Sequence, residues 1–141
     1  MQGVDFGGKH SWWDWHLILS EHPIASPPKP KTKLVDVPGA DGSIDLSEIL
    51  TGRITYEMRT VTCRFVMGGS REAWHYRLED IMQHLHGRTV KIVLDHDPDY
   101  YWLGRAEVKE WNPGQTVAEL TIAAKVQPYK VSCYDSGKKV L

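Results

Sequence analysis

The chain has 141 residues, of which 41% are hydrophobic and 25% charged, which is the size and composition of one globular domain. Its formal net charge of −1 argues against a dedicated nucleic-acid-binding domain, because such domains usually carry a basic stripe that displaces counterions from phosphate. No apolar run approaches the roughly 18 residues of a membrane-spanning helix, and Cys63 and Cys133 alone give no disulfide framework.

The first 30 residues predict extended structure. Three tryptophans, Trp12, Trp13 and Trp15, fall in a stretch from 8 to 19 that has no helix caps, and this stretch indicates an extended arm or first strand. Prolines between residues 23 and 30 fix φ and remove backbone donors, so this segment predicts a polyproline-like connector on the outside of the fold.

A hairpin is predicted next. Residues 32–37 alternate as a strand until Pro38, residues 38–43 form a turn with two glycines, and residues 44–46 resume the extended pattern. Residues 53–66 then predict the longest strand of this half. Its apolar residues change parity near Arg59 and Thr60, which predicts a β-bulge at that point.

One strong helix is expected, over about residues 71–86. Ser70 is its predicted N-cap and Gly87 its predicted left-handed end. A single apolar stripe recurs at helical spacing, formed by Trp74, Leu78, Ile81, Met82 and Leu85.

The remaining pattern is that of antiparallel strands. Residues 90–94, 100–108 and 118–126 alternate, with turns at 95–99 and 112–114. The sequence therefore predicts an α+β, mainly β fold: an antiparallel β-sandwich or barrel-like domain over residues 1–130 with one flanking helix. Residues 131–141 show no pattern and are expected to form a short, flexible C-terminal tail.

The candidate chemistry is weak. Asp95, Asp97 and Asp99 at alternate positions suit oxygen coordination of a hard cation, but Asp and Pro are also what a tight turn between strands prefers. The seven histidines do not assemble a metal site, and no nucleophile, phosphate-loop or dinucleotide motif is present. We therefore expect no enzyme activity, no catalytic residue, no cofactor and no metal.

The aromatic content leaves two readings open. Six tryptophans and six tyrosines either fill the core or serve in part at protein interfaces, where amphipathic aromatic side chains are enriched.

Several stretches, in order and with similar spacing, resemble a known family. They are residues 28–47, 51–59, 85–87 and 97–105, ending near 128–130. Over about residues 3–130 the chain resembles the N-terminal ring domain of the distal tail protein of long, flexible-tailed (siphovirus-type) bacteriophages.

That resemblance implies a virion structural protein of a phage or prophage, assembled in the bacterial host cytoplasm. Six copies would close into a ring at the tail tip, between the tail-tube protein and a tip hub or tail-associated lysin protein. Duplex DNA would pass through the lumen without specific binding, and no membrane would be involved. The implied fold resembles tail-tube proteins. Many members carry a second, carbohydrate-module-like domain, so this chain is expected to form a minimal ring with little receptor binding.

Candidate residues for the subunit interface come from the tryptophan-rich segment and the two hairpin regions. They are Trp12, Trp13, Trp15, Pro38, Asp41, Tyr101, Trp102 and Arg105. Two other functions stay open: a carbohydrate-binding module that stacks sugars on exposed tryptophans, and a metal-assisted hydrolase that uses Asp95, Asp97 and Asp99.

Overall fold

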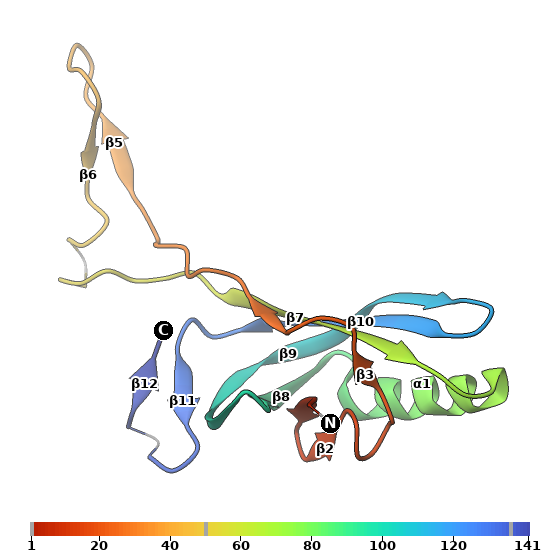
Figure 1. Ribbon diagram of the computed structural model, residues 1–141. Helices are drawn as coiled ribbons and strands as arrows, with labels where there is room; N and C mark the ends of the chain where they lie inside the picture. Colours follow the sequence, from red (N-terminus) through yellow and green to blue (C-terminus); the bar gives the residue numbers. More distant parts are fainter. Residues whose placement is uncertain (1, 50, 136) are drawn as a thin grey trace.

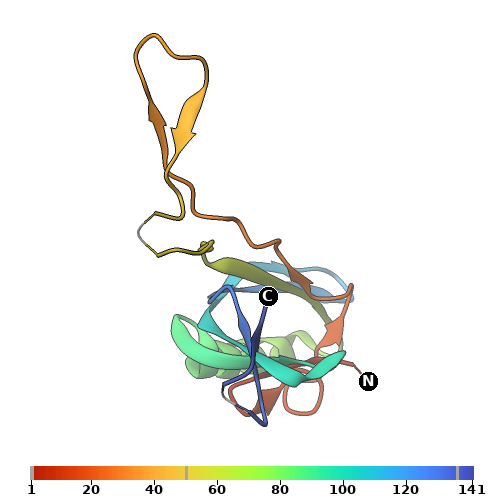
Figure 2. The same ribbon diagram turned by 90° about the vertical axis from the view of Figure 1, so that its left-hand side faces the viewer.

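The computed structural model describes residues 2–49, 51–135 and 137–141. Its body is an antiparallel sheet that curls around one core, with a single described helix packed against it, and a hairpin projects far from the body (Figures 1 and 2). Neighbouring strands follow the order β2-β1-β8-β9-β10-β7-β3, with β4 also on β7. The predicted class, a mainly β antiparallel domain with one flanking helix, is confirmed.

Four strands form the centre of the sheet: β7 (Arg59–Met67), β8 (Arg88–Leu94), β9 (Asp97–Pro113) and β10 (Ala118–Val126). Alternate residues of each face the core, as the period-2 pattern predicted. In β10 the expected residues Ala118, Leu120, Ile122, Ala124 and Val126 are buried, and so is Ala123 between them.

The predicted bulge near Arg59 is wrong. Strand β7 begins at Arg59 and alternates regularly to Met67, because residues 53–58 lie outside the central sheet and belong to the projecting hairpin. A register shift occurs instead on β9, where Thr121 pairs with Glu110 and Ile122 with Val108. The extra residue is Lys109, and Trp111 beyond it still packs against the core.

Two tight connections join the central strands. Leu94 pairs with Asp97, which leaves only Asp95 and His96 as the turn, so β9 starts earlier than the sequence indicated. Residues 114–117 connect β9 to β10, and the Gly114 amide donates to the Val117 carbonyl at 2.9 Å.

Helix α1 (Arg71–Leu85) agrees with its prediction. The Ser70 hydroxyl accepts from the Ala73 amide at 3.3 Å, and Gly87 has φ +75°. Trp74, Ile81 and Leu85 are buried on the core, and the Trp74 indole N–H donates to the Gly68 carbonyl. Met82, expected in the same stripe, is exposed instead.

The N-terminal segment is not an extended arm. It forms four short strands, β1 (Val4–Phe6), β2 (Lys9–His10), β3 (Ile18–Leu19) and β4 (Ile24–Ala25). Between β2 and β3 the chain turns back on itself and buries Trp15 and Leu17 completely in the core. Strand β4 pairs with β7, so the proline-containing segment starts along an edge of the sheet before it leaves the body.

The last residues take part in the fold. Strand β11 (Lys130–Ser132) pairs with the start of β9, and β12 (Lys139–Val140) pairs with β11. The flexibility expected of residues 131–141 stays a prediction.

Candidate interaction surfaces

A long arm is the most prominent surface feature of the molecule. We define the arm as residues 31–58; it ends in the hairpin of β5 (Leu34–Asp36) and β6 (Ser43–Asp45), which the sequence predicted. At its foot the Lys31 amide donates to the Thr55 carbonyl and the Glu57 amide to the Lys29 carbonyl, both at 2.8 Å. Beyond the foot the arm extends away from the body (Figures 1 and 2).

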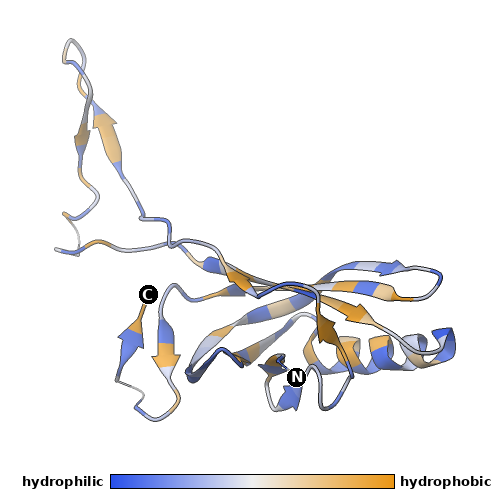
Figure 3. Cartoon of the chain, in the orientation of Figure 1, coloured by the Kyte–Doolittle hydropathy of each residue, from blue (hydrophilic) through white to orange (hydrophobic). Residues whose placement is uncertain are grey.

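The arm is amphipathic. Val35 and Ile44 are cross-strand partners and therefore share one face, whereas Asp36 and Ser43 share the other. Figure 3 shows hydrophobic segments on both arm strands. The exposed large apolar side chains of the arm are Leu34, Val35, Val37, Ile44, Ile49, Ile54 and Met58. A two-stranded hairpin of this kind is at best marginally stable alone in water.

The distal arm, residues 34–52, is also acidic. It carries Asp36, Asp41, Asp45 and Glu48 and contains no lysine or arginine. Hydrogen bonds from the Ser47 hydroxyl and amide lower the pKa of Asp45 and keep that carboxylate ionised. The arm therefore presents apolar side chains beside negative charge.

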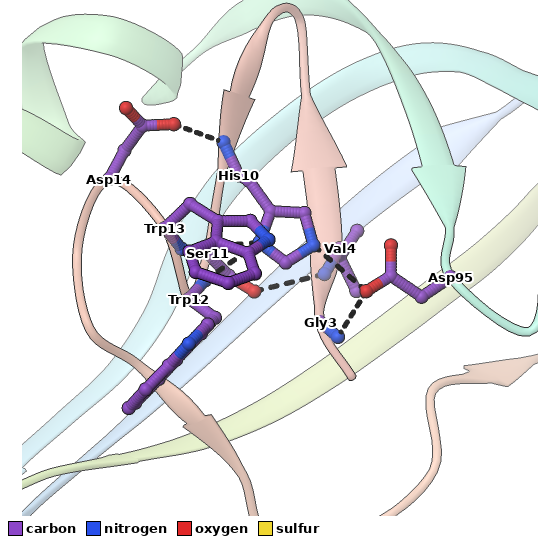
Figure 4. A network of polar contacts seen from close by, with 8 residues as sticks. All are labelled: Gly3, Val4, His10, Ser11, Trp12, Trp13, Asp14 and Asp95. Atoms are coloured by element: carbon purple, nitrogen blue, oxygen red, sulfur yellow. Dashed lines mark hydrogen bonds and ion pairs between the residues drawn. The ribbon is translucent and has the colours of Figure 1, made fainter. Parts of the chain in front are cut away.

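A second surface is the loop that carries Trp12 and Trp13, which a polar network holds in place (Figure 4). His10 Nδ1 accepts from the Trp12 and Trp13 amides at 3.1 and 3.3 Å, so Nε2–H donates to Asp95 Oδ2 at 2.9 Å. The Gly3 amide donates to the same oxygen at 2.8 Å. The imidazole thus fixes the loop and its neighbouring turn in one arrangement, with Trp13 70% exposed.

The acidic turn serves the fold. Asp95 binds Gly3 and His10, whereas the Asp97 carboxylate pairs with Lys130 on β11. Among the described residues no group of three His, Cys, Asp or Glu side chains is placed to hold a metal ion. Asp95 and Asp97 therefore hold separate parts of the chain together, as expected of acidic residues with a structural role.

The Ser43 and Ser47 hydroxyls donate to the carboxylates of Asp36 and Asp45, and both pairs lie on the exposed arm. Burial raises the pKa of the Cys63 thiol to about 12, so this cysteine is a core residue rather than a reactive group. No described helix combines the length and apolarity needed to cross a bilayer.

The eight interface candidates separate into two groups. Trp15 and Trp102 lie in the core, so their side chains are not available to a neighbour, and this part of the expectation is corrected. The remaining six stay predictions. Trp13, Pro38, Asp41 and Arg105 are exposed, and Trp12 and Tyr101 are half-buried.

The tryptophans form no broad platform for sugars. Trp15, Trp74 and Trp102 are buried, Trp12 and Trp111 are half-buried, and only Trp13 is largely exposed. The sequence could not separate these positions, because an indole ring suits a core and an interface equally well.

The sequence singled out Tyr101 and Arg105, but not the cationic outer face of β8, β9 and β10 to which they belong. Tyr101, Leu103 and Arg105 point outward from β9, opposite the buried Trp102, Gly104 and Ala106. Lys91 on β8 pairs with Leu103, and Lys125 on β10 pairs with Arg105. The sequence does place these cations at outward positions of alternating strands. That they lie side by side can be seen only once the order of the strands in the sheet is known.

Comparison with known proteins agrees at the level of the fold. No protein-family model matches the sequence, and no curated protein matches it. A solved structure that does match is the Dit protein (gp 19.1) of SPP1, described as a paradigm of the hub adsorption apparatus in phages that infect Gram-positive bacteria. The TM-score is 0.72 at 17% identity. The match covers 94% of this chain and 52% of the SPP1 protein, so the chain spans about half the length of that relative. The resemblance to phage distal tail proteins is thereby confirmed as a likeness of fold: this chain has the fold of SPP1 Dit over nearly its whole length.

Proposed function

We propose that this protein is a structural component of the distal end of a phage tail, where identical copies close into a hexameric ring. The ring joins the tail tube to the tip hub and leaves a channel through which duplex DNA passes. The fold likeness to the SPP1 Dit protein supports this role.

The observation that carries the proposal is the arm. Its described residues expose large apolar side chains from Leu34 to Met58, and the described residues of the body leave these side chains uncovered. Exposed apolar surface of this extent marks an interaction site. In an assembly of identical chains, the arm of one copy contacts a different surface of the next, and such a heterologous contact closes into a ring when the rotation angle allows it.

The oligomeric state tests the proposal directly. We expect native mass spectrometry and negative-stain electron microscopy of the purified chain to show rings of six. Replacing residues 33–53 by a short Gly-Ser linker should yield a folded monomer that keeps the strong β signal in far-UV circular dichroism, because none of the described residues in this range belongs to the core.

A pair of point variants gives the matched control. Ile44→Asp and Ala40→Asp each add one negative charge to the arm hairpin, but Ile44 lies on the apolar face of β6, whereas Ala40 is exposed between β5 and β6. We expect Ile44→Asp to shift the assembly midpoint to at least tenfold higher protein concentration and Ala40→Asp to leave it within about twofold. A wild-type protein that is monomeric at all concentrations, or equal effects of both variants, would argue against assembly through the arm.

A further inference from the structure

The charge of this chain is divided unevenly between arm and body. The whole chain has 17 basic and 18 acidic residues, and the distal arm holds four of the acidic residues and none of the basic ones. The rest of the molecule therefore has 17 basic against 14 acidic residues, a formal charge of +3. An acidic projection on a basic body is complementary to the body of another copy.

The basic charge has a defined place. Lys91, Arg105 and Lys125 stand on the outer face of β8, β9 and β10, and none of the ion pairs between described residues includes them. The carboxylate beside them, Glu107, is neutralised by Lys109. Lys91 Nζ lies 4.9 Å from the centre of the Tyr101 ring, and Leu103, the cross-strand partner of Lys91, is 38% exposed. The face thus joins positive charge to apolar surface.

Two hollows meet on this face. One, of about 320 Å³, is bordered by Thr60, Arg105, Ala123 and Lys125; the other, of about 500 Å³, lies at the foot of the arm between Tyr56, Met58, Lys125 and Pro128. Lys125 borders both, so the two hollows are neighbours, and together we call them the depression. The carboxylates that line them, Glu107 and Glu57, pair with Lys109 and Lys29. The side chains of Thr60 and Ala123 are small, which leaves the depression open at its base.

We propose that the acidic distal arm of one copy docks on this depression and on the adjoining outer face of β8 and β9 of a second copy, with Val35 and Ile44 against Leu103 and with Asp41 and Glu48 near Lys91 and Lys125. This inference rests on the proposed function and names the two surfaces that meet. Because the depression begins at the foot of the receiving copy's own arm, successive arms follow one another head to tail. The contact is heterologous, as a ring requires.

Charge reversal on each side tests the docking. In one variant Lys91 and Lys125 are changed to Glu, and in a second Asp41 and Glu48 are changed to Lys. The control changes Lys138 and Lys139, beside and on β12, to Glu, an equal change of charge away from the depression. We expect the first two variants each to raise the assembly midpoint at least tenfold, the control to change it less than threefold, and the variant with all four arm and face changes to recover most of the loss.

Photo-crosslinking locates the contact independently. A benzoylphenylalanine at position 35, in a mixture of isotopically light and heavy chains, should give crosslinks between copies to peptides containing Leu103 or Lys125. Intact rings in which both reversals behave like the control, or crosslinks only to other surfaces, would overturn the docking site and leave the ring standing. A wild-type chain that neither assembles nor crosslinks between copies would overturn both proposals.

Discussion

Gly104 shows how a single position sets the spacing of two strands. A Cβ added there would lie 2.2 Å from the Lys125 carbonyl oxygen and 2.6 Å from the Val126 Cα, both backbone atoms of the neighbouring strand. Since backbone cannot move aside as a side-chain tip can, we expect Gly104→Ala to lower the free energy of unfolding by about 2 kcal/mol or more. Chemical denaturation followed by tryptophan fluorescence measures this.

Gly68→Ala is the matched control, because nothing lies within 4 Å of the added atom and the residue does not have positive φ. We expect it to change stability by less than about 0.5 kcal/mol. Equal stability of the two variants would show that β9 and β10 separate at Gly104 more easily than this packing allows.

Asp80 links helix α1 to the N-terminal loop. Its Oδ2 accepts from the indole N–H of the buried Trp15 at 2.7 Å and pairs with Lys9 at 3.3 Å. The Trp15 hydrogen bond, and secondarily Lys9, lower the pKa of Asp80 in the folded state. Asp80→Ala leaves a buried donor without its partner, so we expect a loss of about 1 kcal/mol at pH 7.

The pH dependence of that loss has a definite sign. Because the folded-state pKa is depressed, the ionised carboxylate stabilises the fold above its ordinary value of 3.8, and this contribution disappears as pH falls through the folded-state value. The difference between wild type and Asp80→Ala should therefore shrink below about pH 4. Glu79→Ala, which removes only an exposed pair with His75, should show little difference at either pH.

At the scale of elements, the helix and the central strands could be predicted, because caps and apolar periodicity near each element determine them. Helix α1 follows from its cap, stripe and left-handed end, and β8 to β10 follow from alternation. The turn back that buries Trp15 has no such signal, since it depends on a core pocket formed by strands distant in sequence. The parity change at residues 58–61 was real, but its cause is the exit of the arm from the sheet rather than a bulge. The interface candidates could not be separated for a similar reason. Outward and inward residues of β9 differ by one position, and aromatic character alone does not distinguish the outward Tyr101 from the buried Trp102.

The arm and the central sheet should differ in how easily they open. Strand β10 is hydrogen-bonded on both edges, to β7 and to β9, whereas the arm hairpin has only its own narrow ladder. In the dilute monomer we expect arm amides to exchange with solvent at least a hundredfold faster than β10 amides. In the assembled protein the arm amides should become protected. Hydrogen–deuterium exchange with peptide mapping above and below the assembly midpoint measures both, and arm protection that is the same in both states would show that the arm stays uncovered.

If the arm docks head to tail, each whole molecule provides one arm to a second copy and receives one arm from a third. A copy whose residues 33–53 are replaced by a linker can then receive an arm but cannot provide one. Mixed with the wild type, it should end growing chains of subunits, so that equimolar mixing lowers the yield of closed rings and produces open assemblies that contain an arm-less copy at one end. Native mass spectrometry of chains that differ in mass by the deletion resolves each composition. A reciprocal exchange of arms would give a different result: wild-type assembly would stop at two copies, and the arm-less copy would at most form a mixed dimer held by one arm.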